Sequence, residues 1–499
     1  MLVYYILKRL FKKVLSLLII TVLPIIIYLY IPEDIKYTFN LDRVNQINKY
    51  NIVADFNPQN KEIEINTKIT FVNIADKPLD KIFLHLYPNT FSSKDKVPYY
   101  NHEMEEAYPK GFNPGYVKVK EVKVNNSSAN FKIIGKNQSI LMIKLKKPIK
   151  RNNKRIIDIK CNVKIPNSRG RFGYGNFTYN ITNWYPIVAV YDNEGWNLDP
   201  YHKVGDPFYS NISNYEVEFI TPKEYFPVTT GKIVKKKDKG TKIHYFIKAN
   251  MVRDFAVIVS DKFKCKEAIV EGIKVRSYYF NEKYRDEALE YAVNSLKIFN
   301  KLFGKYPYDE YKVVASDFFV GGMEYPNLVM IDNEIYNYQS PDILEYIIVH
   351  ETAHQWWYGV VGNDEVDEPW LDESITEYST ILYYEEKYGK TAADCIYNIM
   401  IKDQYKQYAK GKNLEEIINK KIDEFTTSRE YTALVYHRGA MALEELRENI
   451  GDEKFFKILR RYYEDYKFKN ATTVDFIKTC KTVLTEKDEE SIKEILCLQ

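Results

Sequence analysis

Two histidines and a glutamate stand close together in the segment IIVHETAHQWWYG, residues 347–359. His350 and His354 are four residues apart, and Glu351 directly follows the first of them. On a helix this spacing puts both imidazoles on one face, about 6 Å apart along the axis, so both can bind one zinc ion at about 2.0–2.1 Å. Because the chain has only 7 histidines, the spacing predicts a zinc site rather than two incidental histidines on an amphipathic helix.

Glu351 is offset from both histidines, so its carboxylate is better placed to contact a water molecule bound to the metal than to bind the metal itself. Zinc acidifies water, and a neighbouring carboxylate can take the proton as that water attacks a carbonyl group. The arrangement therefore predicts a hydrolase in which Glu351 is the general base.

A third metal ligand is expected from the segment EPWLDESITEYST, residues 368–380. A catalytic zinc ion needs three protein ligands and one open position. Glu373 follows His354 after 18 intervening residues, which leaves room for one helix to end near the glycines at 359 and 362 and for a second helix to bring a carboxylate back. Glu377, one turn later, either supports a ligand from behind or is a solvated carboxylate.

These motifs and three further segments carry a resemblance to a known family. The segments are FGKYPYDEYKVVASDF (303–318), GGMEY (321–325) and YHRGA (436–440). Together with HExxH, 18 residues and a glutamate in a Trp-Leu-x-Glu context, they resemble the gluzincin metallopeptidases, specifically the aminopeptidase N family. GGMEY differs from the Gly-x-Met-Glu-Asn motif of that family only at Tyr325, and YHRGA differs from Tyr-x-Lys-Gly-Ala only at Arg438.

The resemblance implies roles for each matching residue. It implies one zinc ion bound by His350, His354 and Glu373, with Glu351 as the general base that later passes its proton to the leaving amine. It also implies that Tyr436 donates a hydrogen bond to the tetrahedral oxyanion, a kind of stabilisation worth several kcal/mol, typically about 3–4. As a plain alternative, Tyr436 is one of 44 tyrosines and could serve only helix packing.

The GGMEY segment is implied to bind the substrate. Glu324 would hold the free α-ammonium of a peptide, which selects for exopeptidase action. Gly321, Gly322 and Met323 would let the substrate approach as an added strand. Because Tyr325 replaces the usual asparagine and Pro326 follows, Glu324 could instead be an ordinary turn carboxylate.

The resemblance thus implies a zinc aminopeptidase that acts on peptides with a free N-terminus. A zinc endopeptidase, or a peptidase of atypical end-specificity, is the alternative that Tyr325 raises. A non-catalytic scaffold of the same fold is a further alternative, but it predicts damaged ligands, whereas the expected ligands and base are all present.

The N-terminal segment has the pattern of a membrane anchor. Four cationic residues, Lys8, Arg9, Lys12 and Lys13, precede an uncharged apolar run over 14–31. Eighteen apolar residues can just span a bilayer as a helix, and the cationic flank should stay in the cytoplasm. No small-x-small cleavage signal follows. We expect residues 1–34 to form an uncleaved single-pass anchor in the cell membrane, with the catalytic part outside the cytoplasm.

The rest of the chain divides by its hydrophobic period. From about 35 to 262 apolar and polar residues alternate in runs separated by Asn, Gly and Pro, which predicts an all-β sandwich-type domain. The aromatic stretch 183–209 within it could line a cleft or cover the core. From 263 to 499 helical spacing dominates, and with the resemblance we expect an α+β thermolysin-like catalytic domain with C-terminal helices.

Composition excludes several other classes. A net charge of +4 is too small to produce a positive electrostatic field that attracts nucleic acid, so no nucleic-acid partner is expected. The 5 cysteines are widely spaced, without a CxxC pair, which argues against a thiolate zinc site and against a disulfide framework.

Overall fold

A large mixed sheet forms the centre of the β-rich half in the computed structural model, which describes residues 47–338, 340–412, 415–484 and 492–498. Its strands alternate buried and exposed side chains, as in β2 (Glu62–Val72), so one face packs inward. The strand order is β14 (Lys232–Lys239), β15 (Lys242–Val252), β12 (Ser213–Pro222), β1 (Asn48–Asn57), β2, β8 (Lys154–Lys164), β4 (Tyr116–Val124) and β5 (Ser127–Ser128).

Two four-stranded sheets complete this half. One has the order β13 (Phe226–Thr229), β16 (Val257–Ser260), β10 (Tyr179–Ile181) and β9 (Gly173–Tyr174), and the other β11 (Ile187–Val188), β3 (Leu79–His85), β7 (Ile140–Ile149) and β6 (Asn130–Ile134). Three short helices connect strands: η1 (Tyr87–Phe91), α4 (Met104–Ala107) and η2 (Lys136–Gln138). Ile65, Leu84 and Ile258, one from each sheet, belong to one hydrophobic cluster, so the three sheets share a core.

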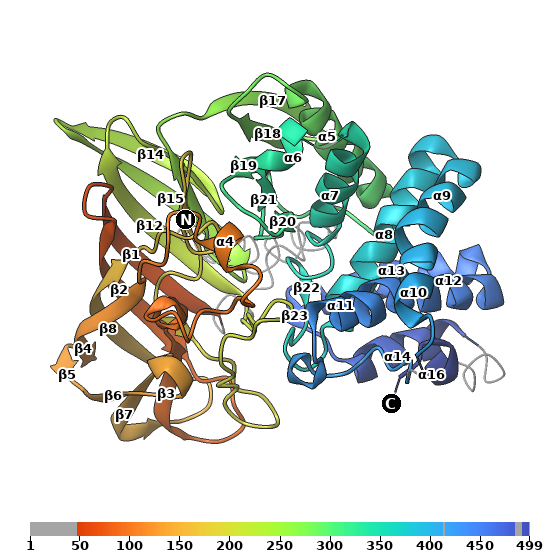
Figure 1. The fold of residues 1–499 in the computed structure, drawn as a ribbon. Coiled ribbons are helices and arrows are strands. Elements are labelled where there is room, and N and C mark those ends of the chain that lie inside the picture. Colours follow the sequence, from red (N-terminus) through yellow and green to blue (C-terminus); the bar gives the residue numbers. More distant parts are fainter. Residues whose placement is uncertain (1–46, 339, 413–414, 485–491, 499) are drawn as a thin grey trace, which may run out of the picture. The chain divides into compact units, whose positions relative to one another are not determined.

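A five-stranded sheet begins the second half (Figure 1). Its order is β17 (Lys264–Val270), β18 (Ile273–Tyr279), β19 (Glu310–Ser316), β21 (Leu328–Asp332) and β20 (Gly322–Met323). Strands β18, β19 and β21 are parallel, and helix α5 (Arg285–Leu302) provides the crossover from β18 to β19. The short strand β20 is at the edge of this sheet, and among the described strands it pairs only with β21.

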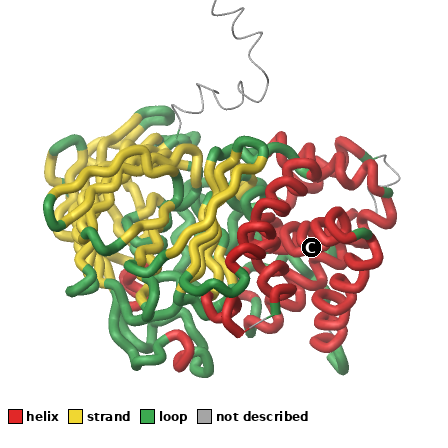
Figure 2. Tube along the Cα trace, turned by 90° about the horizontal axis from the view of Figure 1, so that it is seen from above, coloured by secondary structure: helices red, strands yellow, loops and turns green. Residues whose placement is uncertain are grey.

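Helices make up most of the chain after β21 and gather beside this sheet in Figure 2. They are α6 (Asn333–Tyr338), α7 (Pro341–Ala353), α8 (Trp370–Tyr388), α9 (Lys390–Tyr397), η3 (Asn398–Lys402), α10 (Asp403–Ala409), η4 (Ile422–Glu424), α11 (Ser428–Tyr431), η5 (Thr432–Arg438), α12 (Gly439–Ile450), α13 (Asp452–Tyr466), α14 (Thr473–Val483) and α16 (Ile492–Ile495). A parallel strand pair, β22 (Val361–Gly362) and β23 (Lys469–Asn470), lies among them.

The strands change from one set of sheets to another between Ser260 and Lys264, next to the expected border at 262. The border itself stays a prediction, because residues 48–499 pack as one compact unit. The expected anchor, residues 1–34, lies outside the described residues. Across the ranges that the structure describes, we find no helix that is both long enough and apolar enough to cross a membrane.

Candidate metal centre

Helix α7 places the two histidines of the HExxH motif. Ser340 caps its N-terminus by accepting a hydrogen bond from the Ile343 amide at 3.4 Å, and Pro341 occupies the first turn. His350 lies in the last turn and His354 directly follows the helix. Their Nε2 atoms are 3.2 Å apart, so both rings point to the same place.

Helix α8 brings Glu373 to the two imidazoles. Its Oε2 atom lies 3.5 Å from Nε2 of His350 and 3.2 Å from Nε2 of His354, and all three side chains are buried. Ligands about 2.0–2.1 Å from a tetrahedral zinc ion lie about 3.3 Å from one another. The three atoms therefore form one face of a zinc-sized tetrahedron, and the two-histidine, one-carboxylate donor set fits this metal.

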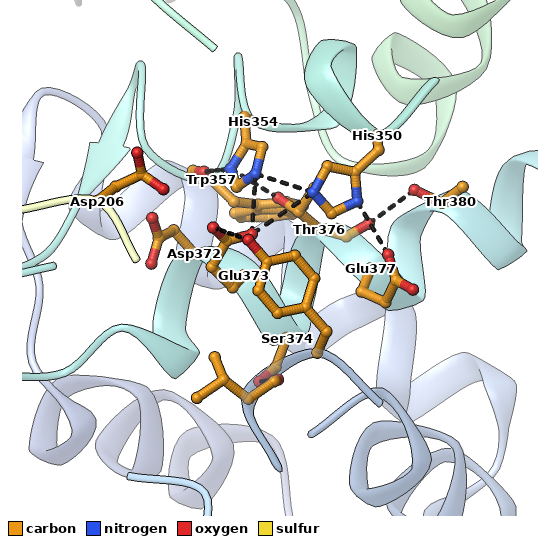
Figure 3. A network of polar contacts seen from close by, with 12 residues as sticks. Asp206, His350, His354, Trp357, Asp372, Glu373, Ser374, Thr376, Glu377 and Thr380 are labelled. Carbon is orange, nitrogen blue, oxygen red and sulfur yellow. Dashed lines mark hydrogen bonds and ion pairs between the residues drawn. The ribbon is translucent and has the colours of Figure 1, made fainter. Parts of the chain in front are cut away.

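The other ring nitrogens of both histidines have oxygen partners (Figure 3). Nδ1 of His350 lies 2.9 Å from Oε2 of Glu377. The other carboxylate oxygen of Glu377, Oε1, accepts a hydrogen bond from the Tyr346 hydroxyl at 2.6 Å. Nδ1 of His354 lies 3.0 Å from the Trp357 carbonyl. Such partners leave Nε2 free for a metal and orient the ring. Glu377 is buried, so of its two sequence interpretations the solvated carboxylate is excluded.

Glu351 lies against the edge strand β20. A Cβ atom at Gly322 would overlap the Glu351 carboxylate, so glycine is required there by the closeness of the two segments. Burial raises the pKa of Glu351 to about 7, while the charges of His350 and His354 lower it. A carboxylate with a raised pKa is suited to accept and later release a proton near neutral pH.

The remaining GGMEY residues have distinct surroundings. Gly321 has a φ of 105°, which favours glycine. The Met323 sulfur accepts a hydrogen bond from Nε of Arg171 at 3.0 Å. Glu324 is buried. Tyr325 is fully buried and its hydroxyl donates to Asn183 of the β-rich half at 3.4 Å, so this departure from the family motif fills the core.

Tyr436 lies in the π-helical segment η5. Its hydroxyl donates a hydrogen bond to Oε1 of Glu373, and the burial of this phenol raises its pKa well above the usual value. The Ser374 hydroxyl donates to the Val435 carbonyl at 2.5 Å, which fastens η5 to α8. A Cβ at Gly439 would overlap Ser374, which explains the glycine of the YHRGA segment.

Two further charged residues reach the centre from the β-rich half. Asp206, at the end of the aromatic stretch 183–209, forms an ion pair with Arg171 and lies on the His354 side of Glu373 in Figure 3. This part of the stretch therefore borders the candidate site. Sequence reasoning did not single out either residue, because neither belongs to a motif and both are distant from α7 along the chain.

The sequence of this chain is similar to those of known peptidases. Residues 287–497 match the Peptidase family M1 domain. Glutamyl aminopeptidase of Rattus norvegicus is 24% identical over 306 residues, which cover 57% of this chain and 31% of that protein. Mitochondrial aminopeptidase 2 of Saccharomyces cerevisiae is 27% identical over 289 residues, covering 54% and 28%. The chain thus spans less than a third of the length of each of these curated relatives.

Solved structures show the same fold. The M1 zinc metallopeptidase of Deinococcus radiodurans matches with a TM-score of 0.66 and 16% identity, over 90% of this chain and 94% of that chain. A mutant of that enzyme bound to a Tyr-Ser-Ala substrate matches with a TM-score of 0.63 and 15% identity over the same shares of the two chains. These likenesses confirm the expected fold class: a β-rich N-terminal half followed by an α+β part with C-terminal helices.

Proposed function

We propose that this chain, whose residues 287–497 match the Peptidase family M1 domain, is a zinc-dependent aminopeptidase. The observation that carries the proposal is the triangle of His350, His354 and Glu373, whose ligand atoms are 3.2, 3.2 and 3.5 Å apart. Glu351 and Tyr436 both lie beside it. Bound zinc would act as a Lewis acid that polarises a carbonyl group and acidifies water.

The surrounding side chains have the other catalytic and substrate-binding roles. Glu351 accepts the proton of the attacking water and delivers it to the leaving amine. Tyr436 transfers its hydrogen bond from Glu373 to the developing oxyanion. Glu324 holds the N-terminal ammonium of the peptide. The edge strand β20 pairs only with β21 among the described strands, so an extended peptide can add along its open side.

Aminopeptidase action is tested with free and N-acetylated peptides on the zinc-loaded protein. We expect cleavage of aminoacyl chromogenic amides and of free peptides one residue at a time, and loss of cleavage when the amine is acetylated. Equal cleavage of both forms would instead indicate a zinc endopeptidase. Glu351→Gln is the control: it should keep zinc and lose about 10²–10⁴-fold in kcat, and retained turnover would contradict its role as base.

We further propose that residues 1–34 anchor the protein in the cell membrane, with the catalytic part outside the cytoplasm. The support is the cationic flank at Lys8 to Lys13 and the apolar run 14–31. The full chain should remain in the membrane fraction after alkaline carbonate extraction, and a chain lacking 1–34 should not. External protease should degrade the catalytic part in intact cells. Recovery of the full chain in the soluble fraction would contradict the anchor.

A further inference from the structure

Tyr358, in the loop after His354, has a strained backbone. Its φ angle is 132°, in the region that favours glycine, and a bulky residue kept there costs free energy. The side chain is also buried, with 1% of its surface exposed. A strained residue persists only where its surroundings hold it in place. The contacts of Tyr358 therefore indicate what this conformation serves.

The peptide group between Trp357 and Tyr358 faces the predicted zinc site. Its carbonyl oxygen lies 3.0 Å from Nδ1 of His354 (Figure 3), and its N–H donates to the Val361 carbonyl at 2.7 Å. The φ angle of Tyr358 is the rotation that joins this peptide group to the rest of Tyr358. Once the rest of the residue is fixed, the strained angle sets the direction of the Trp357 carbonyl, which is toward the histidine.

The Trp357 carbonyl also decides which nitrogen of His354 is available to zinc. A carbonyl oxygen only accepts hydrogen bonds, so it keeps the proton on Nδ1 and leaves Nε2, which lies 3.2 Å from Glu373, free to bind the metal. The Thr376 hydroxyl lies 3.1 Å from the same Nδ1 atom, but a hydroxyl can donate as well as accept and selects neither tautomer. The direction of the Trp357 carbonyl therefore matters for metal binding.

Two consecutive residues of the β-rich half hold the rest of Tyr358. The Arg253 guanidinium donates from Nε to the Tyr358 carbonyl at 2.6 Å, and the Tyr358 hydroxyl donates to Oδ2 of Asp254. Arg253 and Asp254 directly follow strand β15 and are both buried. Because the carbonyl and the phenol are fixed to one short segment, Tyr358 cannot rotate to an unstrained φ without breaking a buried hydrogen bond.

The Asp254 carboxylate is itself oriented for this contact. Its Oδ1 atom accepts a hydrogen bond from the side-chain amide of Asn183 at 3.3 Å, which leaves Oδ2 for the phenol of Tyr358. The amide oxygen of Asn183 accepts in turn from the Tyr325 hydroxyl at 3.4 Å. Hydrogen bonds to a carboxylate are about twice as strong as those between neutral groups, so Asp254 is suited to oppose backbone strain.

We propose that Tyr358 is a positioning residue for zinc binding. Arg253 and Asp254 hold it in its strained conformation, and this conformation orients the Trp357 carbonyl that faces His354. The inference rests on the zinc site of the proposed function, but not on the substrate or on aminopeptidase action. It gives the β-rich half a part in metal binding, although the predicted ligands all come from the other half.

Tyr358→Phe is the first test. The substitution keeps the ring and the strained backbone but removes the hydroxyl that binds Asp254. We expect zinc to bind about tenfold or more weakly, as when a partner behind a metal ligand is lost. Competition with a chelating dye on the full chain measures the affinity. Asp254→Ala removes the same hydrogen bond from the other side, and it serves as the alternative if the first variant does not fold.

Tyr358→Gly distinguishes positioning from packing. Glycine adopts a φ of 132° without strain, so it needs no hydrogen bond to remain there. Its zinc affinity should therefore be closer to wild type than that of Tyr358→Phe. The same substitution deletes a buried ring, so its thermal midpoint should be lower than that of Tyr358→Phe. A purely structural role predicts instead that the less stable glycine variant also binds zinc more weakly.

Tyr383→Phe is the matched control. Tyr383 is as buried as Tyr358, and its hydroxyl donates to a buried carboxylate, that of Glu345, at 2.7 Å. Its backbone is helical, so the loss of this hydroxyl releases no strain. The thermal midpoint of this variant should fall, because a buried hydrogen bond is lost, while its zinc affinity should equal that of the wild type.

The outcomes separate this inference from the proposed function. Unchanged zinc affinity in folded Tyr358→Phe, or weaker binding by Tyr358→Gly than by Tyr358→Phe, would overturn the positioning role. A wild-type chain that binds no zinc would refute the proposed function and this inference with it. Because the readings are affinities, equal cleavage of free and N-acetylated peptides would refute aminopeptidase action alone.

Discussion

Tyr436 contacts two of the three predicted zinc ligands at once. Its hydroxyl donates a hydrogen bond to Oε1 of Glu373, and its ring stacks on the imidazole of His350 with centroids 5.7 Å apart and planes 9° apart. The phenol is therefore held beside the predicted zinc ligands both by its ring and by its hydroxyl.

Tyr436→Phe separates these two contributions. The substitution keeps the stacked ring and removes only the hydroxyl, so we expect zinc content to be unchanged and kcat to fall about 10²–10³-fold, as for other lost oxyanion donors. Steady-state kinetics on an aminoacyl amide and elemental analysis give the two readings. A variant with full activity would show that the hydroxyl serves only packing, the plain alternative raised by the abundance of tyrosines.

Glu377→Gln should weaken zinc binding without removing a ligand. Glu377 faces Nδ1 of His350 at 2.9 Å, and loss of such a carboxylate partner typically lowers metal affinity about 10–100-fold. Competition with a chelating dye measures the dissociation constant. Glu386→Gln, on the same helix but in an ion pair with Lys301, is the matched control. Equal affinities for the two variants would rule out a supporting role for Glu377.

Arg253→Met should destabilise the connection between the β-rich half and the segment after His354. The buried Arg253 guanidinium donates to the carbonyls of Tyr358 at 2.6 Å, Ser210 at 2.9 Å and Lys469 at 2.5 Å. Each buried carbonyl left unpaired costs about 1–3 kcal/mol. The thermal midpoint should therefore drop by several degrees, whereas substitution of the exposed Lys248 on β15 should hardly change it. A midpoint equal to wild type would contradict this account.

His85 should make the protein less stable in acid. It is buried against Tyr87, and burial lowers its pKa from 6.5 to about 4. Between these values the unfolded chain binds a proton that the folded chain does not, so stability is complete above pH 6.5 and decreases as the pH falls toward 4. The loss amounts to about 3 kcal/mol.

His85→Phe provides the test of this pH dependence. The variant keeps an aromatic ring against Tyr87 but cannot titrate. Thermal midpoints measured from about pH 7 to about pH 4 should fall more steeply for the wild type than for the variant. Parallel curves would show that the pKa of His85 is the same in the folded and unfolded chain and would contradict this account.

Much of the local structure followed from sequence pattern. The alternation from about 35 to 262 predicts strands such as the observed Glu62–Val72, and the HExxH spacing predicts the helix observed as α7. Both features depend on periods of a few residues: the two-residue period of a strand and the helical period of about 3.6 residues. The 18-residue gap from His354 to Glu373 was informative for the same reason, since it spans only one loop between two helices.

The contacts of Tyr325 and Asp206 could not be predicted in this way. Tyr325 appeared as an irregularity in a substrate motif, but its hydroxyl is directed at Asn183, 142 positions earlier in the chain. Asp206 belongs to a stretch whose role was open, and its place beside the zinc triangle depends on how the β-rich half packs on β20. Such contacts are set by the closure of long loops around a shared core, for which no short-range period exists.

The sequence by itself determined the chemistry of this protein: two imidazoles, a base and a third carboxylate at spacings that helices translate into one zinc site. Tertiary packing alone decided their surroundings. It buried Glu377 behind His350, directed Tyr436 toward Glu373, and brought Glu324 and Asp372 close to His354. Spacing along a helix is fixed by backbone hydrogen bonds, whereas the approach of distant segments is fixed only when their apolar faces pack together.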